Sequence, residues 1–580
     1  MALQSIAETW LRTFALAAST GDVPAIVQTF LPDGFLRDLL VFTWDVHSLE
    51  GHDKMTAHLR TTLAGAQLSN FKIETRPGLC AEPSTKGGVG ASFTFEMPRR
   101  YGRGYVRLLQ GQPSNEWKAM AVYLAVDDLK GHEELGPEPG VYGGHTLAWE
   151  EVFAARRARI EQDPYVIVLG AGQNGLNAAA RLKQWNIPTL VLEKNARIGD
   201  QWRGRYPTLS LHSIRNWSHL AYHPFPEKWP EYAPREKMGA WLEQYADTQD
   251  IVVWTRSKLL PGARYDSASG RWTVTVDRAG TLVQLHPAHV VCAVGSTGPP
   301  RMPLIPDRAR FAGEVMHSSA YPGGAAYTGK HVVVVGACQS ASDICQDLAF
   351  RGASVTMVQR SSTCVVTIKT AADDERACFP DGVPTDLCDL KFHSLPMGLR
   401  RRLSEEDADL NWERERELHA KLRKGGLKLN MGRNGSGHVF LIYERLGGYW
   451  WDLGLSDYIG SGRVKVKQGV EIKQYVPDGV MCTDNTFLRA DAVILATGWQ
   501  DPREGLKDVF GANVLDKTKT PWGLDDEDEI SGCCRPTGHP GLWYALGDLA
   551  TSRFYSKLLA LQIKAIQVGM SAPAGIQARL

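Results

Sequence analysis

Two long segments of the chain show the same order of apolar and polar positions. One begins at Tyr165 and the other at His331, and each reads as an apolar strand, a glycine-containing turn, a helix and a second apolar strand. Strand and helix patterns continue to alternate from Tyr165 towards the C-terminus. This alternation predicts an α/β architecture in which helices cover parallel sheets, with a nucleotide-binding unit at each of the two turns.

The first part of the chain follows a different pattern. Apolar residues at Ile6, Trp10, Leu11 and Phe14 mark an amphipathic helix, and runs of alternating apolar and polar residues come after it. Such alternation is typical of antiparallel strands with one buried face. Residues 1–128 are therefore predicted to form a separate α+β domain, a cone of helices and a curled sheet.

The remaining boundaries follow from changes in these patterns. Residues 129–160 are rich in Gly and Pro before a charged helix, and we expect a linker in which Trp149 and Phe153 are buried. The other predicted units are the first part of the first nucleotide-binding domain at 161–322, the second nucleotide-binding domain at 323–489 and the rest of the first domain at 490–580.

The second nucleotide-binding domain carries two further patterns after its strand–helix–strand unit. The charged run 403–426 predicts a single solvated helix that is capped by Ser404 and closed by Gly425. The aromatic residues of 447–460 are expected to line a substrate cavity together with 378–392, although packing in an ordinary core explains them equally well.

The first glycine-rich turn has the spacing G-x-G-x-x-G. Gly170 fits a tight turn, Gly172 allows a pyrophosphate to approach the backbone, and Gly175 allows close packing of helix on strand. Glu193 ends the next strand, where a carboxylate accepts ribose hydroxyls and repels a 2′-phosphate. The pattern predicts FAD or NAD here. The expected contacts are Gly170, Gly172, Gln173, Asn174, Gly175, Glu193 and Lys194.

The second turn departs from this pattern at two places. Cys338 stands where the second glycine is expected, and the next strand ends in Arg360 instead of an acidic residue. A guanidinium pairs with a 2′-phosphate, so the second ligand is predicted to be NADPH. Alternatives are a surface arginine on a vestigial unit and a reactive thiol at Cys338. The expected contacts are Gly336, Cys338, Gln339, Ser340, Ala341, Arg360 and Ser361.

Three motifs outside the glycine turns connect the chain with a known family. Residues 199–203 read G-D-Q-W-R, residues 311–321 match F-x-G-x-x-x-H-x-x-x-Y, and residues 492–499 end in A-T-G-W. Together they resemble the flavin-containing monooxygenases, and most closely their plant and fungal branch of indole-3-pyruvate monooxygenases. The resemblance covers about Tyr165 to Met570 and implies two Rossmann-like domains of the glutathione-reductase type.

The same resemblance implies cofactors and a reaction. FAD and NADPH are the expected cofactors, and a C4a-(hydro)peroxyflavin would insert one atom of O₂ into a small organic substrate. N- or S-oxygenation and oxidative decarboxylation of an α-keto acid both remain open. The residues carried over to the FAD site are Gln201, Trp202, Arg203, His212 and Asp548. His212 is also the candidate catalytic residue, with a loop-capping role as its alternative, and no metal is expected.

Three other functions compete with this one. Baeyer–Villiger oxygenation of a ketone is the nearest rival, and Tyr321 disfavours it because those enzymes prefer Trp there. A flavin-dependent disulfide reductase needs a redox cysteine pair beside the flavin, which the first unit lacks. In a binding protein the N-terminal cone would be the functional part. That cone resembles the NTF2-like (SnoaL-like) domains, and we expect it to support oligomerisation, with a homodimer left open, or to cover the flavin cleft.

Composition adds few constraints on partners and location. The 580 residues carry a formal net charge of +1 and are 43% hydrophobic, which favours neither nucleic acid nor a membrane surface. No apolar run approaches the roughly 18 residues of a membrane span, and the N-terminus lacks the pattern of a signal peptide. The 10 cysteines contain no C-x-x-C pair and indicate reduced thiols in the cytoplasm. The final Ala578-Arg579-Leu580 resembles a peroxisomal address.

Overall fold

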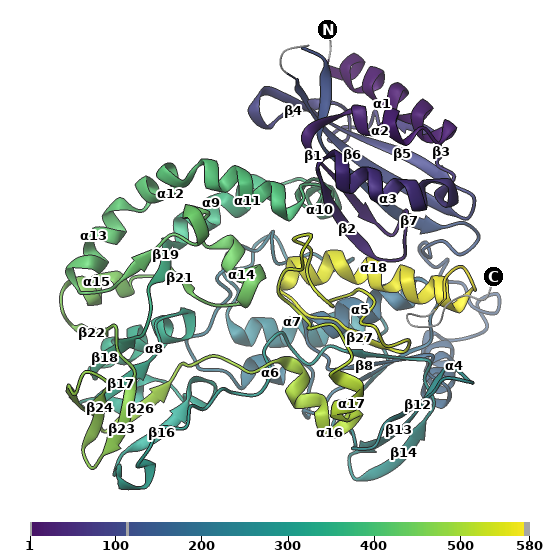
Figure 1. Cartoon of the computed structure of the whole chain (residues 1–580). Coiled ribbons are helices and arrows are strands. Elements are labelled where there is room, and N and C mark those ends of the chain that lie inside the picture. The colour runs from purple at the N-terminus through teal and green to yellow at the C-terminus, as the bar shows by residue number, and fades with distance from the viewer. Residues whose placement is uncertain (1–2, 112–114, 573–580) are drawn as a thin grey trace.

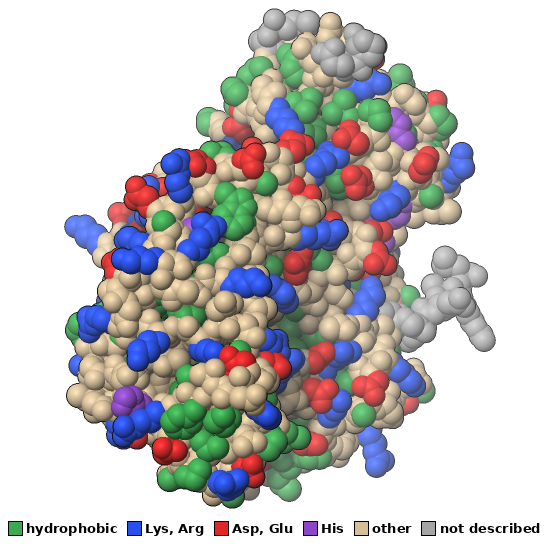
Figure 2. Space-filling model, turned by 60° about the vertical axis from the view of Figure 1, so that its left-hand side comes forward, with side chains coloured by type: hydrophobic (Ala, Val, Ile, Leu, Met, Phe, Trp, Pro, Cys, Tyr) green, Lys and Arg blue, Asp and Glu red, His purple; other side chains and the backbone are tan. Residues whose placement is uncertain are grey.

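The computed structural model describes residues 3–111 and 115–572 of the protein (Figure 1). An N-terminal α+β part lies above two parts that are built on parallel sheets. Within the described residues, no helix combines the length and apolarity that crossing a membrane requires. Figure 2 shows basic and acidic side chains interspersed over the visible face, in keeping with the near-zero net charge.

The N-terminal part is a seven-stranded sheet with helices packed on one face. The strand order is β2-β1-β7-β6-β5-β3, with β4 paired to β5, and only β1 and β7 run parallel. The four apolar residues predicted for the first helix are all buried, which confirms its amphipathic character. The elements are α1 (Leu3–Thr20), α2 (Val23–Gln28), β1 (Phe30–Leu39), β2 (Val46–Glu50), α3 (Gly51–Ala66), β3 (Ser69–Ile73), β4 (Glu82–Ser84), β5 (Gly88–Met97), β6 (Arg100–Gln110) and β7 (Trp117–Leu129).

The linker helix α4 (Trp149–Gln162) lies on the surface and buries none of its residues. The expectation that Trp149 and Phe153 are buried is therefore wrong. Instead the two rings stack on each other with centroids 5.8 Å apart, and the guanidinium of Arg156 lies over Trp149. Stacking within the helix shields part of each ring from water without contact to a core.

The first nucleotide unit forms a five-stranded parallel sheet with the order β10-β9-β8-β15-β27. Helix α5 follows the glycine-rich turn and packs against α18 near the end of the chain. The elements are β8 (Val166–Leu169), α5 (Gln173–Gln184), β9 (Thr189–Leu192), α6 (Asp200–Arg203), α7 (Arg235–Thr248), β10 (Val253–Trp254), β15 (His289–Cys292), β27 (Leu542–Tyr544) and α18 (Leu549–Gln567). A small antiparallel sheet is attached, made of β11 (Ser257–Leu259), β12 (Arg264–Asp266), β13 (Arg271–Arg278) and β14 (Thr281–Leu285).

The second unit forms another five-stranded parallel sheet, ordered β16-β26-β17-β18-β22. Strands β16 and β26 belong to this sheet, although the predicted boundaries at 322 and 490 assign them to the first unit. The elements are β16 (Glu314–His317), β17 (His331–Val335), α8 (Gln339–Phe350), β18 (Ser354–Gln359), β22 (Val464–Gln468) and β26 (Ala492–Leu495), with β23 (Ile472–Val476), β24 (Gly479–Cys482) and β25 (Phe487–Arg489) as a separate small sheet. Helices α16 (Lys507–Phe510) and α17 (Ala512–Leu515) follow.

A mostly helical segment between β18 and β22 reaches up to the N-terminal part (Figure 1). Its elements are β19 (Thr363–Thr367), α9 (Ile368–Cys378), α10 (Thr385–His393), α11 (Met397–Glu406), α12 (Ala408–Arg414), α13 (Arg416–Lys424), β20 (Leu429–Asn430), α14 (Val439–Arg445), β21 (Tyr449–Asp452) and α15 (Leu455–Gly460). The prediction of one helix over 403–426 is wrong, because the chain breaks at Asp407 and Glu415.

Two side chains explain those breaks. Ser404 lies inside α11 and donates to the carbonyl of Ser436, so it does not cap a helix. Glu415 is buried and accepts from the backbone N–H of Thr367, which draws the chain towards β19. Gly425 does cap the last of the three helices, as predicted. Long-range hydrogen bonds thus override the local helical pattern.

Candidate active site

The first glycine turn has no room for a side chain at its two outer glycines, Gly170 and Gly175. Gly170 has φ +102°, a conformation that favours glycine. A Cβ on Gly175 would lie 1.8 Å from the carbonyl oxygen of Gly170, so helix α5 packs directly on the turn. These two residues hold the turn in the shape that the sequence predicts.

Several buried polar groups near the turn lack a hydrogen-bond partner among the residues that the structure describes. A Cβ on Gly172 would meet only the amide of Gln201, at 3.2 Å. Both amide atoms of Gln201 are buried without a hydrogen-bond partner, as are Oδ1 of Asn174 and Oγ1 of Thr551. Unpaired buried amides and hydroxyls are costly, so this arrangement fits a polar ligand such as the pyrophosphate and ribityl chain of FAD.

Glu193 stands where the ribose-binding carboxylate is expected. It is buried, and it accepts from the backbone N–H of Ala171 at 2.9 Å and from that of Asn195 at 2.8 Å. A carboxylate has about four acceptor positions. Two therefore remain for ribose hydroxyls, while the next residue, Lys194, is exposed.

The flavin-signature segment 199–203 is held by an internal salt bridge. The guanidinium of Arg203 pairs with Asp200 at 3.1 Å and with Glu243 of α7 at 3.1 Å. Asp200, which replaces a glycine of the family motif, is thus the partner of Arg203. Arg203 also donates to the carbonyl of Ile198, so its guanidinium is fully engaged within the protein. Trp202 packs against the cores of both nucleotide units.

The second glycine turn is closed by a neighbouring strand. A Cβ on Gly336 would lie 2.3 Å from the carbonyl oxygen of Ala496, so glycine is required there as well. In front of the turn, the sulfur of Cys338 accepts from the backbone N–H of Gly448 at 3.2 Å. The side-chain carbonyl of Gln339 accepts from the backbone N–H of Trp451 at 2.9 Å. Polar groups at this turn have protein partners.

Cys338 does not have the environment of a reactive thiol. Burial raises the pKa of its thiol above the ordinary value, and this outweighs the hydrogen bond from Gly448. This environment disfavours the alternative of a reactive thiol at Cys338. The other nine cysteines are also free thiols. Two of them, Cys533 and Cys534, are adjacent in sequence and lie beside β27, but both are buried and reduced.

The end of β18 presents the basic group that NADPH requires. Arg360 and Ser361 are exposed, and Arg360 forms an ion pair with Glu471 at 3.0 Å. Gln359 instead points inward and bonds to Thr363 and Lys428, so it is unavailable to a phosphate. An exposed ion pair is weak and yields to a doubly charged phosphate. Ser340 and Ala341 begin helix α8 behind the turn.

His212 lies between the two nucleotide units. Its Nε2 is 3.5 Å from the carboxylate of Asp343 on α8, and its ring meets Trp451 edge-on at 6.0 Å between centroids. Tyr206 donates to the same carboxylate. Tyr321, the other residue used in the sequence argument, is buried and donates to Asp347 of α8, away from the cavity described next.

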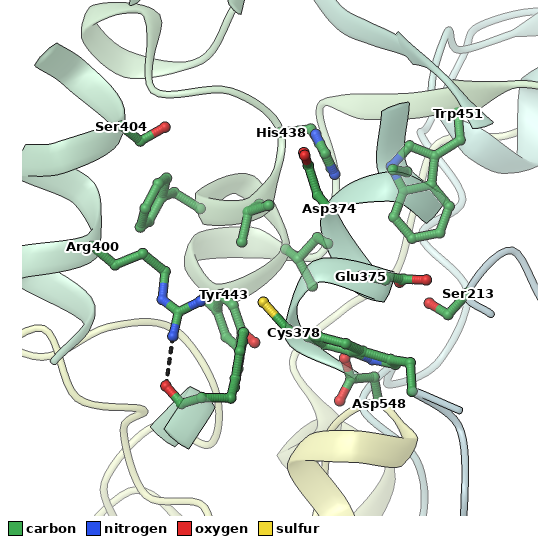
Figure 3. Close-up of a pocket in the computed structure, with 16 residues that line it drawn as sticks. Ser213, Asp374, Glu375, Cys378, Arg400, Ser404, His438, Tyr443, Trp451 and Asp548 are labelled. Carbon is green, nitrogen blue, oxygen red and sulfur yellow. Dashed lines mark hydrogen bonds between the residues drawn. The ribbon is translucent and has the colours of Figure 1, made fainter. Parts of the chain in front are cut away.

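A cavity of about 230 Å³ opens beside His212, next to the N-terminus of α18 (Figure 3). Asp548 lines it and caps α18 by accepting from the N–H of Thr551 at 2.7 Å. The predicted cavity segments contribute Cys378, Phe392 and Trp451. The complete lining is Ser213, Trp217, Ala371, Asp374, Glu375, Cys378, Phe392, Arg400, Ser404, His438, Val439, Phe440, Ile442, Tyr443, Trp451 and Asp548.

Several ionisable groups in this cavity are neutral or paired at neutral pH. Burial raises the pKa of Glu375 to about 8, and the charge of Asp548 adds to the rise. Burial likewise lowers the pKa of His438 to about 4. Asp374 is paired with Arg414 at 2.8 Å. Glu375 also accepts from the backbone N–H of Ile214, which ties the cavity to the loop that carries His212.

Arg400 differs from Glu375, His438 and Asp374. Its guanidinium donates to the carbonyl of Phe392 at 2.7 Å and stacks on the Phe392 ring at 3.8 Å, yet it forms no ion pair within the described residues. Its Nε is buried without a partner. Burial lowers its pKa, but a guanidinium keeps its charge at neutral pH. Figure 3 shows it across the cavity from Glu375 and Ser213.

Sequence reasoning missed Glu375 and Arg400. Arg400 lies in a run of three arginines and Glu375 in a charged helix, and both patterns are typical of solvent-exposed faces. The spacing of Leu399 and Leu403 shows that α11 has an apolar side, but it does not show which neighbour covers that side. The signal that distinguishes these residues is three-dimensional.

The comparisons with known proteins assign the family. Residues 164–502 match the family described as flavin-binding monooxygenase-like. The chain belongs to that family. It is a flavin-dependent monooxygenase, and FAD and NADPH are its cofactors. The nucleotide-binding predictions for the two glycine turns are compatible with this assignment, while the roles of the individual residues stay predictions.

Relatives and folds of similar proteins agree with the family. The chain is 31% identical over 341 residues to the indole-3-pyruvate monooxygenase YUCCA1 of Oryza sativa subsp. japonica, covering 58% of this chain and 77% of that protein. It is 31% identical over 356 residues to the probable indole-3-pyruvate monooxygenase YUCCA9 of Arabidopsis thaliana, covering 61% and 79%. A crystal structure of OTEMO in complex with FAD and NADP shares the fold, with TM-score 0.52, 18% identity and coverage of 70% and 87%.

Proposed function

We propose that this flavin monooxygenase carries out the oxidative decarboxylation of a small aromatic α-keto acid. Arg400 carries this proposal, because it is a cation without an ion pair within the described residues, in a cavity whose lining includes five aromatic rings. These rings belong to Trp217, Phe392, Phe440, Tyr443 and Trp451. A buried cation is stabilised by an anionic ligand, and it disfavours the binding of an aliphatic amine, which is protonated in neutral solution. The relatives named indole-3-pyruvate monooxygenases act on such an acid.

The overall reaction balances with the family's cofactors. An α-keto acid, O₂, NADPH and a proton give the carboxylic acid with one carbon less, CO₂, water and NADP⁺. Bound FAD supplies the activation of O₂ with the electrons of NADPH. The residues of the chain bind the carboxylate through Arg400, enclose the aromatic group with Phe392 and Trp451, and exclude water from the cavity.

Glu375 has a supporting role in this proposal. With a pKa of about 8 it is protonated at neutral pH, so it adds no negative charge opposite Arg400 and is available to donate a proton near Ser213. Above pH 8 the carboxylate forms, and affinity for an anionic substrate should fall. In Glu375→Gln the KM for the α-keto acid should stay flat between pH 7 and pH 9, whereas in the wild type it rises.

The experiment is a comparison of substrates with one ring and different charges. Purified protein is supplied with FAD and NADPH, and phenylpyruvate is compared with phenylethylamine, phenylacetone and thioanisole by product mass and CO₂ release. Turnover of the keto acid, with a KM raised at least about tenfold in Arg400→Gln, supports the proposal. Preferred turnover of the amine or sulfide, or of the ketone to an ester, contradicts it.

The remaining expectations on partners and location stay proposals. Small-molecule substrate and O₂ are the partners that the chemistry requires. A homodimer, cytoplasmic location and peroxisomal import are unproven expectations, and the C-terminal tripeptide lies outside the described residues. Size-exclusion chromatography with light scattering and imaging of a fluorescent fusion with and without the last three residues would decide them.

A further inference from the structure

We propose that the N-terminal part of the chain positions Arg400 and thereby sets the affinity of the cavity for an anionic substrate. The effect on substrate rests on the proposed function, but the effect on Arg400 itself does not. The segment from Lys391 to Glu406 contains the end of α10, a short loop and α11, and it carries Arg400 on α11. Figure 1 shows this segment directly beneath the N-terminal sheet.

Two arginines of the N-terminal sheet hold the loop before α11. Arg37 of β1 donates to the carbonyl of His393, and its other nitrogens bind Glu529 and Tyr555. Arg107 of β6 donates to Oγ of Ser394 at 2.6 Å and to the carbonyl of Lys391 at 2.9 Å. The loop's polar groups therefore depend on the N-terminal part for hydrogen bonds.

The apolar side of α11 is buried against the same sheet. Leu399 is fully buried in a cluster with Phe35, Met120 and Ala121. Leu403, one turn further along α11, packs on the same cluster. Successive residues of a helix differ by about 100° in direction, so fixing Leu399 and Leu403 also fixes the direction in which Arg400 leaves the helix.

Ion pairs fasten both ends of the segment to the N-terminal part. Lys391 pairs with Glu82 at 2.7 Å, before the loop. Arg402 pairs with Asp33 at 2.9 Å, and Glu406 pairs with Lys86 at the end of α11. Each exposed pair is weak, but together with the buried contacts they define a single register between the sheet and α11.

The hydrogen bonds continue from the N-terminal part to the guanidinium of Arg400. Arg37 holds the carbonyl of His393, and the preceding carbonyl, that of Phe392, accepts from Arg400. The Phe392 ring also stacks beneath that guanidinium. A shift of the loop would therefore move both groups that orient Arg400. Arg37 and Arg107 are positioning residues, since neither lines the cavity.

Arg107 is the better residue to test, because Arg37 shares a buried ion pair with Glu529. Removing Arg37 would leave a buried carboxylate uncompensated and endanger folding. Arg107 forms no ion pair within the described residues, so Arg107→Met leaves no such charge. The matched control is Lys557→Met, which removes another contact of the N-terminal part, the pair between Lys557 of α18 and Asp127 at 2.7 Å, without touching the segment.

The full-length holoenzymes are compared by amide hydrogen exchange and by kinetics with phenylpyruvate. In Arg107→Met, exchange of residues 391–406 should accelerate and the KM should rise, each about tenfold, while kcat changes less than about threefold. Arg107→Lys should fall between this variant and the wild type, and it replaces Arg107→Met if that protein does not fold. Lys557→Met should stay within about twofold of the wild type in both measurements.

The outcomes separate this proposal from the proposed function. Unchanged exchange in the segment, or a KM effect no larger than that of Lys557→Met, overturns the positioning role. A loss in kcat at unchanged KM also overturns it. If the wild type does not oxidise phenylpyruvate, the proposed function fails, and the exchange measurement together with binding of phenylacetate by calorimetry still tests whether the N-terminal part controls anion affinity through Arg400.

Discussion

The two glycine turns have similar backbones but opposite states of hydrogen bonding. At the first turn, both amide atoms of Gln201 and an oxygen of Asn174 are buried without partners. At the second, Cys338 and Gln339 are paired with the backbone of Gly448 and Trp451. Unsatisfied buried groups favour a ligand that stays, because its departure exposes their full cost. Satisfied groups tolerate a ligand that comes and goes.

This difference fits a division of labour between the two cofactors. A resident FAD would complete the first turn, and an NADPH that exchanges in each cycle would displace weak contacts at the second. The polar groups at the second turn keep their hydrogen bonds when no nucleotide is bound, so the free energy cost of releasing the nucleotide is small. The exposed Arg360 is accessible from solvent. A glycine pattern alone does not distinguish a site for a permanent cofactor from a site for a co-substrate. The hydrogen bonds of the side chains around the turn do distinguish them.

The largest expected effect comes from Gly175→Ala in the first turn. The new Cβ would lie 1.8 Å from the carbonyl oxygen of Gly170, so α5 must move and the FAD site is lost. The purified variant should lack the visible absorbance of bound flavin and should not regain it with added FAD. Gly65→Ala, at a helical position with open space around it, is the control and should remain yellow. Full retention of flavin by Gly175→Ala would contradict the assignment of this turn.

The next effect concerns the charge that selects the second nucleotide. Arg360→Ala should raise the KM for NADPH about tenfold to a hundredfold and leave the KM for NADH nearly unchanged, because only NADPH carries the 2′-phosphate. Steady-state oxidation of both nucleotides measures this. In Arg360→Lys, which keeps the charge but not the paired N–H groups, the KM for NADPH should lie between those of the wild type and Arg360→Ala. Equal losses with NADPH and NADH would show that Arg360 supports the fold and does not read the phosphate.

A smaller effect in the opposite direction is expected from Glu471. This carboxylate competes with a phosphate for Arg360, so Glu471→Gln should lower the KM for NADPH by about twofold to fivefold. Because both groups are exposed, the gain should disappear in about 0.5 M salt. A raised KM would mean that Glu471 orients Arg360 instead of competing for it.

The smallest effect is expected at Cys338. Cys338 is half-buried, and burial raises the pKa of its thiol, so we expect it to contribute shape rather than redox or nucleophilic chemistry. Cys338→Ser should keep kcat and the KM for NADPH within about twofold of the wild type, since the hydroxyl can still accept from Gly448. Loss of turnover in Cys338→Ser, with the flavin still bound, would instead support a chemical role for the Cys338 thiol.

Local sequence patterns were sufficient to predict the two strand–turn–helix–strand units. In each sheet, the glycine turn and the charged residue, Glu193 or Arg360, directly follow neighbouring strands, so sequence order alone brings them to the same edge of that sheet. The amphipathic first helix was also predictable, because its apolar period is complete within the helix. Such features depend on neighbours a few residues away.

Features that depend on distant contacts were not predictable. Ser404 carries the signature of a helix cap, but its hydroxyl reaches Ser436 and the helix continues through it. Arg400 looks like any surface arginine until α11 is packed between the cavity and the N-terminal sheet. Trp149 shows the reverse case, because its size predicts burial while its neighbours on α4 leave it at the surface.

The ion pair between Arg37 and Glu529 joins residues that are 492 positions apart. During synthesis on the ribosome, the first strands of the chain emerge long before the carboxylate that neutralises Arg37. The surface of the N-terminal sheet that contacts α11 and Glu529 therefore stays exposed until those residues have been synthesised. Docking of the N-terminal part onto the rest of the chain is then expected to be one of the last steps of folding. Chains that are truncated before residue 529 would leave that surface exposed to solvent, and we expect such fragments to bind chaperones.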